Sequence, residues 1–450
     1  MTAPPESGAT SAARRPKLDR AVIVGDLEVT RLTCGLLTER GVTVLHLPAP
    51  TERELAEALA TGASAIAILV RGDVVALRYA LLAEHLRPGI RLVATLFDQT
   101  LADQLRRVVP NSHISSPADV AAPAIVGACL EPGVLAALRD GDSDFLLHGP
   151  LESPSVARWS APRRSWSGAL SGQLRAHDDS ARILLAGLAG LVLVLLTDWV
   201  LSMTALHDGP LPSFYNAVRV IATVGPADAG GEPRSYLVVA STLMLITIVL
   251  TAIFTAGVVN RVLSGRSVAV LGRRTVPRRQ HVVVIGLGQV GLRVAIRLRS
   301  LRIPVVVIER DPQAPNLRLA KRAGIPVLVA HAEDRAVLAR LRLDRARALV
   351  ALGSHDLDNV ETAIAALAVA PRLRVVLRAG ESDLIAETCS LFPIGEVRDV
   401  TALTAVAITL RLLGSHPLAI VAERDTLAAF DGVRAQPVAL GPRCRCRPTA

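Results

Sequence analysis

Two apolar stretches in the middle of the chain decide its fold. Residues 183–203 read ILLAGLAGLVLVLLTDWVLSM, and residues 236–259 read YLVVASTLMLITIVLTAIFTAGVV. Each is close to the ~20 apolar residues that a helix needs to cross a bilayer. The sequence therefore predicts a hairpin of two membrane-spanning helices over residues 183–259.

The segment between these stretches, residues 211–231, reads LPSFYNAVRVIATVGPADAGG. Its apolar side chains recur at helical spacing as far as Ile221, and Gly225 and Pro226 then interrupt the pattern. Non-helical backbone at membrane depth is stable only where it is buried in protein or lines a water-filled cavity. The segment therefore predicts a short helix that ends in a re-entrant loop.

Arginine is distributed unevenly around the hairpin. Residues 158–182 hold five arginines and residues 261–279 hold six, whereas the loop at 204–235 holds two. Because short cytoplasmic segments carry an excess of positive charge, we expect both ends of the chain on the cytoplasmic side of the plasma membrane. The same clusters account for the pI of about 10.3, so we expect no nucleic-acid partner. We expect Asp198 at the membrane interface, where an ionisable side chain costs least.

Residues 20–150 alternate short apolar runs with segments of helical spacing, which predicts a parallel, doubly wound sheet. The turn after the first run keeps only Gly25 of the three glycines that a dinucleotide-binding turn requires. Pro48 stands where an acid would end the second strand. We therefore interpret this domain as a degenerate copy of a nucleotide-binding domain that binds no nucleotide.

Residues 280–425 contain a complete glycine signature. The run Gly286-Leu-Gly288-Gln-Val-Gly291 follows an apolar strand and opens a helix, and the next strand ends at Glu309. The glycines allow a tight turn, a close approach of backbone to phosphate and close packing of helix on strand, while the acid takes the ribose hydroxyls. An acid favours NAD or an adenine nucleotide over NADP, and the neighbouring Arg310 weakens that preference. An empty domain of the same fold is the alternative. The residues expected at the nucleotide are Gly286, Gly288, Gln289, Val290, Gly291, Glu309 and Arg310.

The five cysteines include no C-x-x-C pair and no histidine at zinc-finger spacing, so we predict buried thiols in a reducing compartment and no metal site. No general acid or substrate domain accompanies the glycine signature, so we predict no catalytic residues and no enzyme. A nicotinamide-dependent oxidoreductase is the weakest alternative.

From residue 280 the chain resembles the RCK domain, the regulator of potassium conductance that also occurs in TrkA-type potassium-uptake subunits. The matching motifs are the glycine signature, VLVAHAED at 327–334, SHDLDN at 354–359 and the helix at 400–413. His331 stands where the family usually has an acid, and the resemblance implies that this position faces the nucleotide. The first domain aligns with the second at constant offsets, without a segment of about twenty residues that includes the third strand.

The hairpin resembles the pore module of the potassium-channel superfamily, in which backbone carbonyls of a Thr-Val-Gly-Tyr-Gly run replace the hydration shell of the ion and four subunits complete the ring. Here Pro226 and Ala227 stand in place of Tyr and Gly. The interpretations therefore range from a cation pathway with fewer carbonyl sites to a hairpin that does not conduct. The positions implied to line the ion path are Thr223, Val224 and Gly225, with Asp228 near the outer mouth.

The predicted fold class is α/β Rossmann-like, with two RCK domains of the TrkA-N type, plus an α-helical membrane hairpin. The resemblance implies a homotetrameric, potassium-related cation channel whose cytoplasmic domains bind a nucleotide and gate the pore. A non-conducting, membrane-anchored regulatory subunit of a separate potassium transporter is the alternative. The predicted divisions are a disordered lead (1–19), a degenerate domain (20–150), a basic linker (151–182), the hairpin (183–259), a connector (260–279), the nucleotide domain (280–425) and a tail (426–450).

Overall fold

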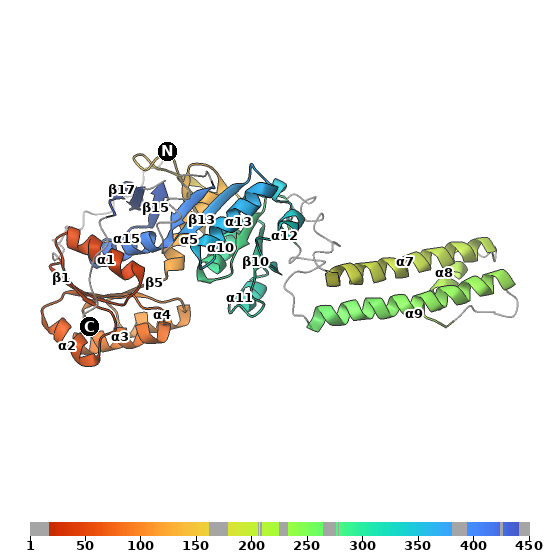
Figure 1. Ribbon diagram of the computed structural model, residues 1–450, viewed down its shortest axis with the longest axis horizontal. Helices are drawn as coiled ribbons and strands as arrows, with labels where there is room; N and C mark the ends of the chain where they lie inside the picture. The colour runs from red at the N-terminus through yellow and green to blue at the C-terminus, as the bar shows by residue number, and fades with distance from the viewer. Residues whose placement is uncertain are drawn as a thin grey trace, which may run out of the picture.

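The computed structural model describes residues 18–161, 179–205, 207, 209–224, 233–263, 276–277, 279–379, 394–423 and 426–440. Two α/β lobes form one body, and a helical hairpin extends from it (Figure 1).

Each lobe is built on a parallel sheet, which confirms the predicted fold class. The order is β2-β1-β3-β4-β5 in the first lobe and β11-β10-β9-β12-β13-β14 in the second. The extra strand, β11, is the one that the sequence alignment finds missing from the first lobe. The strands of the first lobe are β1 (Arg20–Val24), β2 (Thr43–Leu47), β3 (Ala65–Ile68), β4 (Arg91–Thr95) and β5 (Ser112–Ser115). Those of the second are β9 (Val282–Ile285), β10 (Val305–Glu309), β11 (Val327–Val329), β12 (Ala348–Ala351), β13 (Arg374–Ala379) and β14 (Glu396–Asp399).

The strand register repeats between the lobes. Val24 pairs with Leu47 in the first, and Ile285 pairs with Ile308 in the second. Pro48, which follows β2, therefore occupies the position of Glu309 at the end of β10. The first lobe thus matches the second in structure as well as in sequence.

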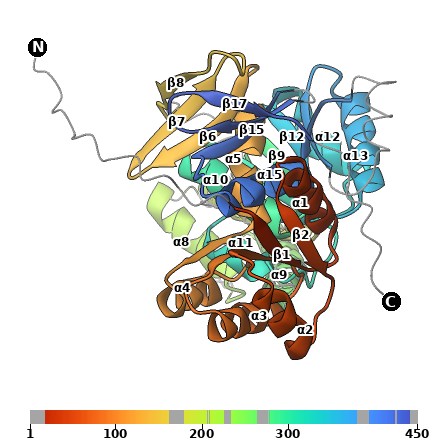
Figure 2. The same ribbon diagram turned by 90° about the vertical axis from the view of Figure 1, so that its left-hand side faces the viewer.

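Helices of the two lobes pack against each other at the boundary between the lobes. Helix α5 packs against α10 of the second lobe, and α15 packs against α1 of the first. Helices α1, α5, α10 and α15 lie together in Figure 2. Their apolar faces form one continuous core, in which Cys34, Ile125, Val294 and Ile408 are fully buried. The helices of the first lobe are α1 (Glu28–Glu39), α2 (Glu52–Ala60), α3 (Asp73–Leu86), α4 (Gln99–Val108) and α5 (Pro117–Leu130). Those of the second are α10 (Gln289–Ser300), α11 (Leu317–Arg322), α12 (Arg335–Arg340), α13 (Asp356–Val369) and α15 (Val400–Leu412), with a 3₁₀ turn at Leu343–Arg345.

Two of the predicted boundaries are wrong, because each parallel sheet is followed by a small antiparallel sheet. The first continues to residue 158, inside the predicted linker, and the second continues to residue 438, inside the predicted tail. The two small sheets pack on each other, with Leu147 and Phe430 buried between them. The strands in these segments are short, four or five residues each, so the sequence pattern did not reveal them. The strands are β6 (Val134–Asp140), β7 (Ser143–His148), β8 (Ser155–Arg158), β15 (Ala419–Glu423), β16 (Thr426–Phe430) and β17 (Ala435–Val438).

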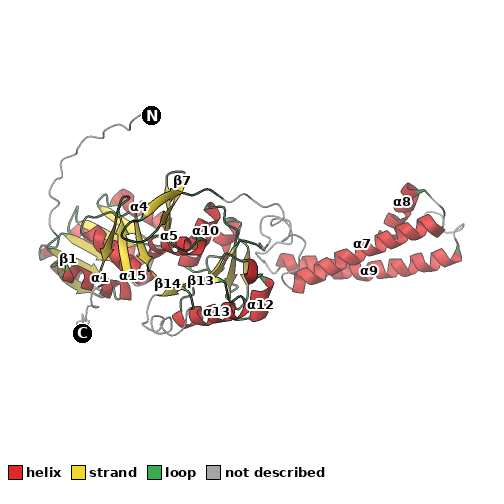
Figure 3. Ribbon diagram, turned by 90° about the horizontal axis from the view of Figure 1, so that it is seen from above, coloured by secondary structure: helices red, strands yellow, loops and turns green. Residues whose placement is uncertain are grey.

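The hairpin consists of α7 (Asp179–Ala205), α8 (Pro210–Ile221) and α9 (Arg234–Leu263). Helices α7 and α9 are long and apolar enough to cross a membrane, and most of their apolar residues are exposed in the single chain. They approach closely at small residues: a Cβ on Gly187 would lie 3.1 Å from the Phe254 backbone, and one on Gly257 would lie 3.0 Å from that of Leu184. Helix α8 lies against the end of α7 that is remote from the lobes (Figure 3).

The interfacial depth expected for Asp198 stays a prediction, and the structure adds that its side chain is enclosed by protein. Its side chain is fully buried in the hairpin, and neither carboxyl oxygen has a hydrogen-bond partner among the described residues. One turn further along α7, the buried Ser202 hydroxyl lies 3.0 Å from the Tyr236 hydroxyl of α9. The sequence pattern placed Asp198 near the end of a span, and in the structure both α8 and α9 pack against α7.

Candidate functional site: the glycine turn and its cleft

The glycine turn connects β9 to α10 at the carboxyl edge of the second sheet. Gly286 has φ of +88°, a conformation that side chains rarely adopt. A Cβ on Gly291 would lie 2.0 Å from the Gly286 carbonyl oxygen, so only glycine fits there. A Cβ on Gly288 would meet nothing within 4 Å. The backbone at Gly288, the N-cap of α10, is therefore open to a ligand, and the first free amides of the helix favour an anion there.

Glu309 lies beside this turn at the end of β10. One carboxylate oxygen accepts a hydrogen bond of 2.6 Å from the Leu287 amide, and the other accepts one of 3.0 Å from the Asp311 amide. The Asn316 side chain donates to the Leu287 carbonyl oxygen at 3.0 Å and is itself buried. Hydrogen bonds within the chain itself thus hold the Glu309 carboxylate against the glycine turn.

The opposite wall of the cleft comes from the end of β12 and the start of α13. The buried Asn359 side chain accepts from the Gly353 amide at 2.7 Å and donates to the carbonyls of Gly353 and Arg378, both at 3.2 Å. Arg310 crosses toward this wall and pairs with Asp358 at 3.3 Å. The cleft has a volume of about 280 Å³ and is open on one side. Sequence reasoning did not single out Asn359 or Asp358 individually, although both lie in the SHDLDN segment.

Of the eight expected nucleotide residues, Gly291 packs against the turn, and the other seven take different positions. Four of them line the cleft: Gly286, Gly288, Glu309 and Arg310. Gln289 is exposed and Val290 is buried in α10, so these two shape the helix start. The His331 side chain is 76% exposed and lies 3.8 Å from Glu333, while Ala330, Ala332 and Glu333 line the cleft.

Of the expected ion-path residues, Thr223 and Val224 are described, whereas Gly225 and Asp228 lie outside the described residues. Helix α8 ends in a hydrogen-bonded turn, in which the Thr223 amide donates to the Val220 carbonyl and the Val224 amide donates to the Arg219 carbonyl. Thr223 has φ of +58°, so the chain leaves the helix sharply at the first of these positions. The predicted short helix is therefore confirmed, and the course of the loop after it stays a prediction.

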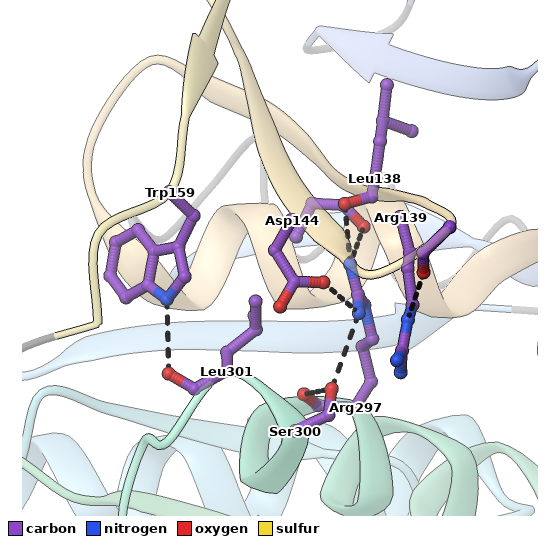
Figure 4. Close-up of polar contacts among 9 residues, drawn as sticks. Leu138, Arg139, Asp144, Trp159, Arg297, Ser300 and Leu301 are labelled. Atoms are coloured by element: carbon purple, nitrogen blue, oxygen red, sulfur yellow. Dashed lines mark hydrogen bonds and ion pairs between the residues drawn. The ribbon is translucent and has the colours of Figure 1, made fainter.

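The far end of α10 is held by the first lobe, in a contact that we call the α10 clasp (Figure 4). Arg297 donates to the Asp144 carboxylate and to the Leu138 carbonyl, both at 2.6 Å. The Trp159 indole donates to the Leu301 carbonyl at 3.1 Å. Trp159 therefore packs on the second lobe. In sequence, Trp159 lies twenty residues before the first residue of α7.

Within the described part of the chain, no group of three His, Cys, Asp or Glu side chains is placed to hold a metal ion. The two described cysteines, Cys34 and Cys129, are free and buried, and burial raises the pKa of both thiols.

A glycine turn at the start of a helix, an acid at the end of the next strand and a parallel sheet define a domain of the dinucleotide-binding fold. Here it is joined to a hairpin with the dimensions of two membrane spans. Residues 282–390 match the family model described as the TrkA-N domain.

Curated relatives and a solved structure extend this match. The chain is 25% identical over 200 residues to "Potassium channel protein 1" of Methanocaldococcus jannaschii, covering 43% of this chain and 60% of that protein. It is 24% identical over 182 residues to "Voltage-gated potassium channel Kch" of Escherichia coli, covering 38% of this chain and 42% of that protein. The structure titled "Crystal Structure of the GsuK RCK domain" has a TM-score of 0.50 at 13% identity, covers 90% of this chain and 79% of its own, and shows the fold alone.

This chain spans 60% or less of the length of these two curated relatives. The TrkA-N match, the relatives, the RCK-like fold and the two long apolar helices together fit a fusion of a membrane hairpin with RCK domains, as the sequence predicted.

Proposed function

We propose that this protein is a potassium-channel-like cation transport protein whose RCK domains bind NAD or an adenine nucleotide and gate its pore. The observation that carries the proposal is the open backbone at Gly288 beside Glu309, on a helix whose other end is held by the α10 clasp. The similarity to proteins named as potassium channels supports potassium as the transported ion and a channel in preference to an enzyme.

The nucleotide would be held by the chain's own polar groups. The amides at the start of α10 would bind the phosphates, and the Glu309 carboxylate would accept hydrogen bonds from the ribose hydroxyls. Because that carboxylate already accepts a hydrogen bond from the Leu287 amide, binding would change the hydrogen bonding of the turn itself. Arg310 and Asp358 would close the cleft over the ligand from the other side.

Helix α10 would pass this change to the membrane hairpin. It spans twelve residues, from the turn at its start to the α10 clasp at its end. A helix of this length, roughly 18 Å, moves as a unit, so a shift at the phosphates displaces Arg297 and the first lobe with it. The first lobe leads by way of Trp159 to α7, and the second lobe is preceded by α9, so both membrane helices are attached to parts that the nucleotide moves. A nucleotide with different affinities for the two arrangements would then gate the pore.

For the pore we propose a homotetramer, with Thr223, Val224 and Gly225 of each chain along the ion path, Asp228 near the outer mouth and both chain ends in the cytoplasm. The sharp turn at Thr223 supports the ion path, because a backbone that leaves its helix within the membrane needs a protein or water-filled surrounding. The exposed apolar faces of α7 and α9 support insertion in a membrane and contact with further copies.

The proposal is tested by potassium flux in liposomes that contain only the purified protein, with and without NAD, NADH, ATP and ADP. Flux that responds to one of these nucleotides is expected. Nucleotide binding without any flux would favour the second candidate, a regulatory subunit of a separate potassium transporter; a transport protein that co-purifies from the native membrane would support it.

A further inference from the structure

The edge of the second lobe at β11 is strongly basic. Strand β11 is the outermost strand of its sheet. Leu317 of α11 and Leu338 of α12 belong to different cores, so the two helices cover opposite faces of this sheet. Residues 311–347, which include all three elements, hold eight lysines and arginines and four acids. This edge therefore carries a net positive charge.

Four arginines of this edge are exposed, and none of them has a salt-bridge or side-chain hydrogen-bond partner in the described part of the chain. The nearby acids are engaged elsewhere. Asp344 pairs with Arg342 and Arg345, and the Asp334 side chain caps the start of α12. The four arginines, which we call the basic edge, are Arg318 and Arg322 on α11 and Arg335 and Arg340 on α12.

Two large apolar side chains are exposed on the same elements. Leu319 of α11 is 48% exposed and lies between Arg318 and Arg322 in the sequence, and Val329 of β11 is 43% exposed. Protein surfaces that bind membranes combine basic side chains, which are attracted to anionic headgroups, with apolar side chains that enter the boundary of the lipid. The composition of this edge therefore fits a membrane surface.

The first lobe supplies an internal comparison. Helices α2 and α12 are equivalent, because each leads into the strand that pairs with the first strand of its sheet, β3 or β12. Helix α2 carries three glutamates and one arginine, whereas α12 carries two arginines and no acid. In Figure 1, α2 lies at the end of the body remote from the hairpin, and α11 and α12 lie toward the end from which the hairpin extends. Of the two equivalent helices, the one nearer the membrane helices is thus the basic one.

We propose that the basic edge docks on the headgroups of anionic lipids in the cytoplasmic leaflet of the membrane. The guanidinium groups would pair with the lipid phosphates, and Leu319 and Val329 would lie at the boundary between headgroups and acyl chains. The chain that leaves β11 forms one wall of the cleft through Ala330 and Ala332, so docking would fix that wall relative to the membrane. This inference rests on the proposed function only for the membrane position of the hairpin and the cytoplasmic side of the lobes. It requires neither ion flux nor nucleotide binding.

The test is fluorescence quenching of a label on the basic edge by lipid headgroups. Ala339→Cys, at an exposed position of α12, is introduced in the full-length protein with Ser at 389, 444 and 446 and is labelled with a fluorophore. The protein is placed in nanodiscs of phosphatidylcholine alone or mixed with phosphatidylglycerol, each with a headgroup spin-labelled lipid as quencher. Strong quenching is expected with phosphatidylglycerol, and weak quenching with phosphatidylcholine alone or at high salt, because salt screens the charges. Equal quenching in the two membranes, or none in either, would overturn the proposal.

Charge removal in the labelled protein supplies an independent measurement. Each basic residue near an anionic surface raises the ratio of docked to free lobes roughly fivefold, so Arg318→Gln with Arg322→Gln is expected to lower that ratio roughly twentyfold. Arg53→Gln with Arg107→Gln, which alters two exposed arginines of the first lobe, is the matched control and should leave the quenching unchanged. A basic-edge pair that is quenched like the unaltered chain, or a control pair that loses as much quenching, would contradict the assignment.

A second label separates docking of the edge from insertion of the hairpin. Ile248→Cys lies on α9 at a position that is 55% exposed, and acyl-chain spin labels are expected to quench a fluorophore there. Quenching at 248 without quenching at 339 would overturn the docking and leave the proposed function intact. Absence of quenching at 248 would overturn the membrane position of the hairpin, on which both proposals rest.

Discussion

Replacing Gly288 with alanine separates the proposed nucleotide contact from the stability of the domain. Gly288 has φ of −66°, a value that alanine adopts without strain, and the added Cβ would meet no protein atom within 4 Å. The methyl group would instead occupy the space in front of the first amides of α10, where we place the phosphates. The variant is therefore expected to fold normally and to bind nucleotide poorly.

The two effects differ in size. Alanine is a poorer N-cap than glycine, which lowers the free energy of unfolding by up to about 1 kcal/mol. Alanine also restricts the unfolded chain, which raises the free energy of unfolding by about 0.4–1 kcal/mol. The free energy of unfolding should thus change by less than about 1 kcal/mol. A hydrogen bond to a charged group contributes about 1.5–3 kcal/mol, so the loss of one phosphate contact lowers the nucleotide affinity roughly ten- to hundredfold.

The assay is calorimetric titration of the purified protein with NAD, NADH, ATP and ADP, alongside thermal unfolding of the same samples. Gly72→Ala is the matched control, because Gly72 is also an N-cap glycine with negative φ but begins α3 in the degenerate lobe. Affinity within a factor of two of wild type in Gly288→Ala would refute the placement of the phosphates. Unfolding of Gly288→Ala would refute the inference that this position faces open space.

Three further predictions concern Glu309 in the cleft, Arg297 in the α10 clasp and His281 before β9. Glu309→Gln removes the negative charge at the expected ribose site, and it should reduce the preference for NAD over NADP roughly tenfold in competition titrations; an unchanged ratio would contradict this role. Arg297→Ala breaks the α10 clasp with Asp144, so nucleotide affinity should be retained while flux loses its nucleotide dependence; flux that still responds would show that coupling takes another route. His281 is fully buried, and burial lowers its pKa to about 4, so the unfolded state binds more protons below about pH 6.5. Stability should therefore be highest above that pH and fall by roughly 3 kcal/mol as the pH decreases through 4, and His281→Leu should flatten the dependence of Tm on pH.

Local patterns were sufficient for much of this molecule. The apolar periodicity of residues 183–203 and 236–259 reports membrane spans because a span requires a fixed length of apolar residues whatever its surroundings. The turn at Gly286 could be recognised because its glycines meet steric demands of the backbone within six residues. Structural requirements that neighbouring residues meet among themselves can therefore be recognised in the sequence.

Features that depend on contacts between residues far apart in the sequence could not be predicted in this way. The strand at residues 155–158 pairs with β7, and the strands at 426–430 and 435–438 form a sheet with β15 that packs on the small sheet of the first lobe. Because these contacts lie outside the segments themselves, the segments resembled linker and tail. Asp198 is buried in the packed hairpin, where α7 contacts both α8 and α9, and the cleft wall at Asn359 is assembled by hydrogen bonds to Gly353 and to the next strand.

The relation between the lobes was likewise a matter of tertiary structure. The sequence by itself determined that one lobe has the complete glycine signature and that the other keeps only Gly25 of it. Only the folded chain determined that Arg297, at the end of the helix that this signature begins, is held by Asp144 of the other lobe. The physical reason is that a hydrogen bond between residues so far apart in sequence depends on the positions of both lobes, which no local pattern encodes.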